Sequence, residues 1–132
     1  MSNYSFSVKS WNKINAKLVH PDIKRLLVEA IKDTPIDFTV IETVRDMRKQ
    51  KEYYNKGKSK TLNSRHIPSC NKSGLCEAAD LAPYPIDWND IERFRALAAH
   101  ILKKAEELNI PITWGGDWTS FIDMPHYELK RK

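Results

Sequence analysis

The segment from Asp90 to Leu108 constrains the fold most strongly, because its apolar residues recur at helical spacing. Asn89 precedes this segment and Glu92 stands three residues later, an arrangement typical of an N-cap and its capping-box partner. A helix with so wide an apolar face has to bury it against another layer. The apolar positions are Ile91, Phe94, Leu97, Ala98, Ile101, Leu102, Ala105 and Leu108.

Shorter segments supply the rest of the expected fold. The spacing predicts further helices at 21–32 and 46–55 and short strands at 36–42, 78–82, 111–114 and 125–129. Residues 58–77 show no periodicity and indicate a long loop, which in a compact domain is usually functional. Helices and short strands in mixed order predict an α+β fold, in which a small, mostly antiparallel sheet packs with about three helices.

Composition limits the classes of protein that the chain can belong to. Its 132 residues, 41% of them hydrophobic, suit a single domain over 1–132. No apolar stretch approaches the roughly 18 residues that cross a bilayer, so stable membrane insertion is not expected. The N-terminus lacks the apolar region of a secretory signal peptide.

Positive charge is concentrated in the first half of the chain. Residues 1–60 carry 13 basic and 7 acidic side chains, a net charge of +6, whereas residues 61–132 carry 9 and 10, a net charge of −1. The densest part, Arg45–Lys60, favours a polyanionic partner such as nucleic acid, anionic lipid or an anionic cell-wall polymer. A solvated helix face explains the same charges equally well.

Two histidines lie beside carboxylates in turn-rich segments and are candidates for a metal site. A hydrolytic zinc ion takes three protein ligands and keeps one open position. His66, Asp80 and His126 form such a set, and two imidazoles with one carboxylate cancel only one of the two charges of the ion. Asp123, three residues before His126, is a candidate general base. By spacing alone, a surface histidine with capping aspartates is the more ordinary interpretation.

Four motifs occur in a specific order along the chain. They are SRH (64–66), AADL (78–81), WGGDW (114–118) and DMPHYEL (123–129). Three further motifs precede them: LVHPDI (18–23), FTVIE (38–42) and KGKS (56–59). Together they resemble the zinc D-alanyl-D-alanine carboxypeptidase / L-alanyl-D-glutamate endopeptidase family, particularly its small phage endolysins. The resemblance covers about residues 7–129.

The resemblance implies a role for each matching position. His66, Asp80 and His126 match the ligands of Zn²⁺, which would lie in a groove of the α+β fold. Asp123 matches the general base that also hands the proton to the leaving amine. Arg45 matches the catalytic arginine near the metal, where a guanidinium can stabilise an oxyanion or bind a substrate carboxylate.

Substrate-binding positions follow from the same motifs. Ser64 matches the serine before the ligand histidine, and its hydroxyl could bind substrate or cap the loop. Trp114 and Trp118 could form a wall of the substrate groove. For Trp114, a place in the core beside a tight turn is the alternative that we favour. Gln50 is expected to support Arg45.

The segment between the first two ligands is longer than usual for the family and leaves alternatives open. It makes Glu77 a rival of Asp80 as the carboxylate ligand. Cys70 and Cys76 could close a disulfide, remain reduced, or join His66 in a second zinc site. We expect the reduced pair.

The resemblance implies a zinc-dependent peptidoglycan peptidase that hydrolyses the L-alanyl-D-glutamate bond of the stem peptide and lyses the cell wall. D-alanyl-D-alanine carboxypeptidase activity is the alternative within the family. A nucleic-acid-binding module built on 45–60 is the alternative from another class, but no binding motif supports it, so nucleic acid is not an expected partner. The expected protein is a monomer that binds the anionic wall and stays in the host cytoplasm until its release to the wall.

Overall fold

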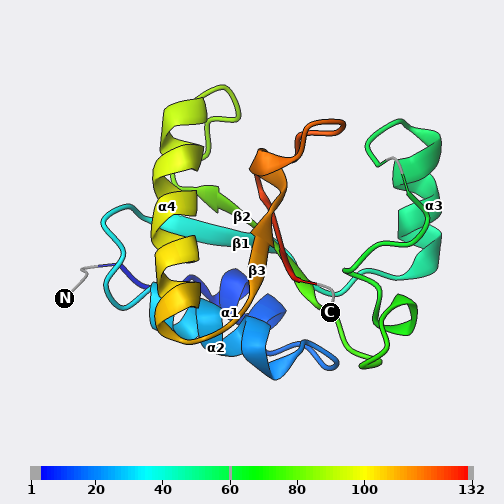
Figure 1. Ribbon diagram of the computed structural model, residues 1–132, viewed down its shortest axis with the longest axis horizontal. Helices are drawn as coiled ribbons and strands as arrows, with labels where there is room; N and C mark the ends of the chain where they lie inside the picture. The colour runs from blue at the N-terminus through cyan, green and yellow to red at the C-terminus, as the bar shows by residue number, and fades with distance from the viewer. Residues whose placement is uncertain (1–3, 60, 131–132) are drawn as a thin grey trace.

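The computed structural model describes residues 4–59 and 61–130, which form a four-stranded sheet and four α-helices (Figure 1). The helices are α1 (Val8–Ile14), α2 (Pro21–Ala30), α3 (Met47–Asn55) and α4 (Ile91–Glu107), and two short 3-10 helices are η1 (Pro68–Cys70) and η2 (Gly115–Asp117). The strands are β1 (Phe38–Glu42), β2 (Ala78–Pro83), β3 (Ile112–Trp114) and β4 (His126–Leu129).

The sheet has the order β1-β2-β4-β3, and its neighbouring strands all pair in antiparallel fashion. Side chains alternate between the two faces of each strand. Ala79, Leu81 and Tyr127 point to the core, where each is at most 2% exposed. Asp80 and His126 fall on the opposite face, so alternation along β2 and β4 separates the core from the polar site.

Three helices close the core. α4 packs on β2 and β3, α2 packs on α4, and α1 packs on β1. In Figure 1, α4 stands beside the sheet with α1 and α2 below it. The start of α2 follows from its sequence, because Pro21 occupies its first turn and the His20 ring accepts the Asp22 N–H at 3.0 Å.

The remaining helix, α3, is different in composition and place. It lies across the sheet from α4, at the far side of the molecule in Figure 1. Gln50 is its one buried residue, and the other α3 side chains are exposed or half-buried. Asp46 caps it by accepting the Lys49 N–H at 2.8 Å.

An irregularity in β1 changes the face on which its last residue lies. Phe38 pairs with Pro83 and Val40 with Leu81, but Glu42 then pairs with Asp80, so Ile41 is an extra residue in the ladder. Strict alternation would place Glu42 on the core face together with Val40. The bulge turns it to the face of Asp80, as bulges beside functional sites often do.

The structure confirms the α+β fold with its antiparallel sheet and corrects several details. α1 was not expected, because its seven residues are too few for an apolar period to be recognised. Asp90 caps α4, instead of Asn89, by accepting the Arg93 N–H at 3.3 Å. The loop 58–77 contains η1. No helix in the described part of the chain is long and apolar enough to cross a membrane.

Candidate metal centre

Two predicted ligands face each other across adjacent strands. Asp80 of β2 and His126 of β4 are direct cross-strand partners, and His126 Nδ1 lies 3.2 Å from Asp80 Oδ1. Direct cross-strand neighbours on one face have their Cβ atoms within about 5 Å, so the register alone brings this pair together. The sheet therefore fixes two of the three predicted ligands.

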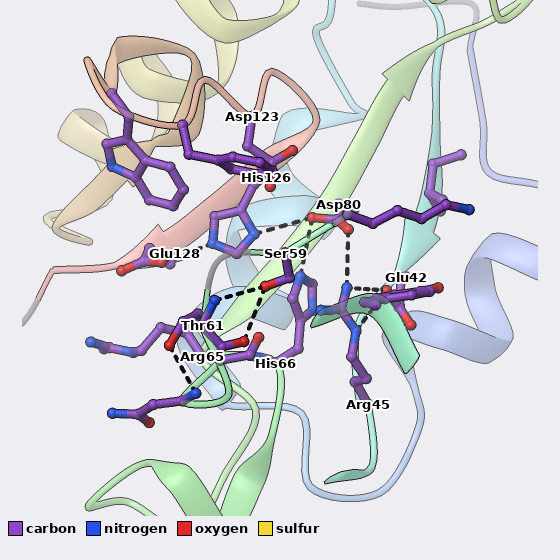
Figure 2. A pocket seen from close by; sticks show the side chains of 17 residues that line it. Glu42, Arg45, Ser59, Thr61, Arg65, His66, Asp80, Asp123, His126 and Glu128 are labelled. Atoms are coloured by element: carbon purple, nitrogen blue, oxygen red, sulfur yellow. Dashed lines mark hydrogen bonds and ion pairs between the residues drawn. The ribbon is translucent and has the colours of Figure 1, made fainter. Parts of the chain in front are cut away.

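The third predicted ligand comes from the loop before β2. His66 is 1% exposed, and its Nε2 lies 3.1 Å from the same oxygen of Asp80 (Figure 2). Its other nitrogen, Nδ1, lies 2.6 Å from the Thr43 carbonyl oxygen, and its own carbonyl accepts the Arg45 N–H at 3.1 Å. The segment after β1 thus fixes both the position and the orientation of the His66 ring.

The hydrogen bonds determine which imidazole nitrogens carry protons. A carbonyl oxygen only accepts, so His66 Nδ1 donates to Thr43, and His126 Nε2 likewise donates to the Glu128 carboxylate at 2.8 Å. In the neutral rings, the lone pairs of His66 Nε2 and His126 Nδ1 then face the Asp80 carboxylate. Three acceptor atoms within 4.8 Å of one another repel unless a cation lies between them. This donor set fits zinc, which prefers imidazole and carboxylate ligands.

The pKa shifts of the same residues show that the electrostatic potential at the site favours positive charge. Burial opposes the charged form of His126, but its hydrogen bonds to Asp80 and Glu128 outweigh burial and raise its pKa to about 9. Burial also opposes the Asp80 carboxylate, yet the charges of His66 and His126 hold its pKa far below the ordinary value. A positive charge is therefore strongly favoured at this point, and a metal ion would supply it in place of protons.

Arg45 connects the candidate metal ligands to α3. It is 8% exposed, donates twice to Glu42 through Nε and Nη2, and its Nη2 lies 3.6 Å from the second oxygen of Asp80. Its Nη1 donates to Gln50 Oε1 at 2.7 Å, so Gln50 supports Arg45 as the sequence indicated. Arg45 thus forms an ion pair with Glu42 and also contacts Asp80.

His66, Asp80 and His126 line a pocket of about 340 Å³. Asp123 lies in its wall beside His126, as Figure 2 shows. Burial, with a smaller contribution from the charge of Asp80, raises the pKa of the Asp123 carboxyl. A raised pKa suits a group that accepts a proton during catalysis, because its basicity is greater than that of an exposed carboxylate.

Two backbone contacts hold Asp123 in place. Its N–H donates to the Gly115 carbonyl at 3.0 Å, and its own carbonyl accepts the His126 N–H at 3.1 Å. A Cβ atom on Gly115 would lie 2.3 Å from the Asp123 carbonyl oxygen, so only glycine permits this approach. The first glycine of WGGDW thus serves the placement of Asp123.

The predicted substrate-binding residues separate into two groups. Ser64 and Trp118 line the pocket, and the Trp118 ring centroid lies 5.2 Å from that of His126. Trp114 does not line it: the ring is 8% exposed, stacks on Tyr127 and donates through Nε1 to the Met124 carbonyl at 2.7 Å. We therefore assign Trp114 to the core instead of the groove wall, because its edge and face are both occupied by protein.

The long segment between the first two predicted ligands is anchored to the rest of the molecule. Glu77 pairs with Arg65 and so does not compete with Asp80 at the centre. Asn71 donates through its side-chain amide to the carbonyls of Arg65 and Leu75 at 2.9 and 2.8 Å. Cys76 exchanges backbone hydrogen bonds with the segment before α2, donating to Leu18 at 2.6 Å and accepting from His20 at 2.9 Å.

The two cysteines take no part in the centre. Both are free thiols, and Cys76 Sγ donates to the Ala78 carbonyl at 3.2 Å. Burial raises the pKa of the Cys76 thiol to about 11, so it remains protonated at neutral pH. Within residues 4–59 and 61–130, the one His/Cys/Asp/Glu group arranged for a metal is His66, Asp80 and His126.

Sequence reasoning missed two residues of the site. Glu128 holds His126, and the Thr43 carbonyl holds His66. A signal existed for Glu128, since it stands two residues after His126 on a strand and must share its face. No sequence signal marks Thr43, because its carbonyl is common to every residue type.

Known proteins of one kind match this chain. The family model of phage L-alanyl-D-glutamate peptidases matches residues 1–132. The L-alanyl-D-glutamate peptidase of Escherichia phage T5 is 32% identical over 116 residues, which cover 86% of this chain and 81% of the relative. The peptidase of the same name from Listeria phage A118 is 28% identical over 134 residues, which cover 98% of this chain but 42% of that longer protein.

A solved structure matches the fold over almost its whole length. The crystal structure of the Serratia marcescens L-Ala D-Glu endopeptidase ChiX has a TM-score of 0.80 and 29% sequence identity to this chain. The match covers 97% of this chain and 92% of that one. The α+β architecture around the centre is therefore shared with a solved endopeptidase.

Proposed function

This chain belongs to the phage L-alanyl-D-glutamate peptidase family, and we propose that it is a zinc-dependent peptidoglycan peptidase that hydrolyses the L-alanyl-D-glutamate bond of the stem peptide. The metal requirement rests on one observation: an acceptor atom from each of His66, Asp80 and His126 lies within 4.8 Å of the other two. Asp123 lines the same pocket. We extend the proposal to a single catalytic domain over 1–132 that acts as a monomer.

The residues of the centre suit the hydrolysis of an amide. A zinc ion bound by His66, Asp80 and His126 would polarise the scissile carbonyl and acidify a water molecule. Asp123 accepts a proton from the attacking water, whose oxygen forms the new bond to the carbonyl carbon. The same carboxyl then returns the proton to the glutamyl nitrogen as the carbon–nitrogen bond breaks. The products are a carboxylic acid that ends in alanine and a free amine on the glutamyl residue.

Neighbouring residues position these groups. Thr43 and Glu128 fix the tautomers of the two histidines, which leaves the lone pairs directed at the metal position. Arg45 contacts the second oxygen of Asp80 and lines the pocket, so its guanidinium holds the carboxylate and faces the substrate. Ser64 and Trp118 offer a hydroxyl and an aromatic surface to the peptide.

The endopeptidase reaction is favoured over D-alanyl-D-alanine carboxypeptidase activity by the names of all the relatives described above. The formal net charge of +5 suits attraction to an anionic wall. Binding of nucleic acid is disfavoured, because Arg45 is buried and paired while Lys49 pairs with Glu42 at 3.3 Å. Lys60, at the end of the basic segment, lies outside the described residues.

Incubation of the zinc-loaded protein with purified muropeptides, followed by mass spectrometry, tests the proposal. We expect cleavage after L-alanine, loss of cleavage with a chelator, and recovery when zinc is restored. Elemental analysis should find one zinc per chain and none in His126→Ala. Release of terminal D-alanine would instead show the carboxypeptidase reaction, and turnover that resists chelation would overturn the metal mechanism.

If the protein is a phage endolysin, it acts on the wall after release from the host cytoplasm. We therefore expect intact bacteria with an outer barrier to resist added protein, and purified wall to lose turbidity.

A further inference from the structure

Three cations line the pocket among the described residues, and two of them are already paired. Arg45 is committed to Glu42, Asp80 and Gln50. The Nη2 atom of Arg65 donates to both Glu77 and the Leu129 carbonyl. Lys58 is the third cation, and its ammonium group has no acceptor within 4–59 and 61–130.

The backbone of Lys58 is held although its side chain is exposed. It follows the end of α3, and its N–H donates to the Tyr53 carbonyl at 2.8 Å. The next residue, Ser59, donates to the same carbonyl and is tied through its hydroxyl to the buried Gln50 amide at 2.9 Å. Lys58 therefore stands at a defined point of the pocket rim, with a charge that the fold itself does not use.

The other charged groups of the pocket leave Lys58 as the cation that can bind a further carboxylate. Its lining includes four carboxylates, those of Glu42, Asp80, Asp123 and Glu128. A glutamyl residue has one amine and two carboxyl groups, so it keeps a free carboxylate whichever carboxyl continues the chain. A substrate with glutamate after the scissile bond brings that carboxylate close to the centre, where the charges of Arg45, Arg65 and a bound metal ion are already offset by protein carboxylates, so Lys58 offers the positive charge that remains free to receive it.

Resting on the proposed function, we propose that Lys58 binds the free carboxylate of the glutamyl residue and thereby selects it over uncharged residues at that position. Arg45 and Arg65 would have to break existing ion pairs to do the same. A lysine on a flexible stem provides a point charge that reaches the carboxylate without a fixed geometry. The contact forms in the substrate complex and would strengthen binding.

Two matched peptides test this assignment. They carry the L-alanyl-D-glutamyl bond and differ in one group, the free carboxylate or its carboxamide. We expect the wild-type protein to prefer the carboxylate by about tenfold in kcat/KM, mainly through KM, since one charge-assisted contact accounts for about that factor. The preference should shrink with added salt, which screens an accessible pair.

Three variants locate the effect. Lys58→Met should bring the ratio of the two kcat/KM values close to one, and Lys58→Arg should restore most of the preference. Lys56→Met, an exposed lysine at the C-cap of α3 that does not line the pocket, should leave both rates as in the wild type. Calorimetric titration of the same peptides into the Asp123→Asn protein, with and without Lys58→Met, measures the affinity difference without turnover.

The outcomes separate the inference from the proposed function. Cleavage of both peptides at equal rates by the wild type, or an unchanged preference in Lys58→Met, overturns the role of Lys58 and leaves the peptidase intact. Cleavage of neither peptide by the zinc-loaded wild type overturns the proposed function, and this inference with it. A lost preference in Lys58→Met, rescued by arginine, supports both.

Discussion

The apolar body and the polar wing of this molecule contribute to the site in different ways. The apolar body consists of α1, α2, α4 and the sheet; the polar wing comprises residues 43–59 and 61–66, which include α3. The body provides Asp80 and His126 from paired strands, whereas the wing provides Arg45, Ser64 and His66 from turns and loops. Burial of apolar surface stabilises the body, while the wing depends on a few buried hydrogen bonds.

The comparison teaches that stability and activity are separable in this protein. The core cluster contains none of the three candidate metal ligands, and the site face of the sheet contributes little to that cluster. The variants below test this separation.

The largest effect is expected from Asp123→Asn. Amide in place of carboxylate removes the group that accepts and returns the proton, so kcat should fall by about 10²- to 10⁴-fold. Zinc content and the thermal unfolding temperature should remain close to those of the wild type. Asp117→Asn, in the adjacent turn and outside the pocket lining, is the matched control and should keep full activity. Near-normal turnover in Asp123→Asn would show that another group is the base.

A variant in the body should have the opposite profile. Leu97 is fully buried in α4, and Leu97→Ala should lower the free energy of unfolding by about 2–5 kcal/mol. Below the transition temperature, zinc affinity and kcat should change little, because Leu97 belongs to the core cluster and that cluster contains no wing residue. Chemical denaturation together with zinc titration checks both. A parallel loss of zinc affinity would show that the body and the centre are coupled.

Gln50→Leu tests the wing. The Gln50 side chain is fully buried and connects Arg45 at 2.7 Å, Ser59 at 2.9 Å and the Thr61 carbonyl at 2.6 Å. Leucine leaves these partners unsatisfied, so we expect faster amide hydrogen exchange in the wing and about a tenfold loss of kcat/KM. The exchange of α4 should stay unchanged.

Lys51→Met, on the exposed side of the same helix, is the control for Gln50→Leu and should match the wild type. Equal acceleration of exchange in α4 and the wing would mean that the two regions unfold as one unit.

The difference between the regions also explains what the sequence could predict. Hydrophobic periodicity in the sequence predicted α2, α4 and the strands. The family resemblance pointed to His66, Asp80 and His126 as the metal ligands. The bulge at Ile41 and the contact of the Thr43 carbonyl with His66 depend on how segments far apart in sequence meet. Such contacts involve backbone atoms or packing that any residue pattern would allow, so no local signal reveals them.

The smallest effect concerns an ion pair at the surface of the body. Lys104 donates to Asp33 at 2.7 Å, and this hydrogen bond lowers the pKa of the Asp33 carboxyl and raises that of Lys104. Asp33 is about half exposed, so solvent screens the pair and Lys104→Met should cost at most about 1 kcal/mol at pH 7. Lys103→Met changes an exposed neighbouring lysine that takes no part in the pair, and it is the control.

The pH dependence of this cost has a defined sign. Because folding lowers the pKa of Asp33, its stabilisation is present above the ordinary value of about 3.9 and is lost as the pH falls through the lower folded pKa. Because folding raises the pKa of Lys104, its stabilisation is lost as the pH rises through a value above the ordinary one of about 10.4. Urea unfolding of wild type and Lys104→Met should therefore differ by a constant amount from about pH 5 to 9 and converge at both extremes. A difference that persists or grows on acidification would show that Lys104 contributes through something other than its pair with Asp33.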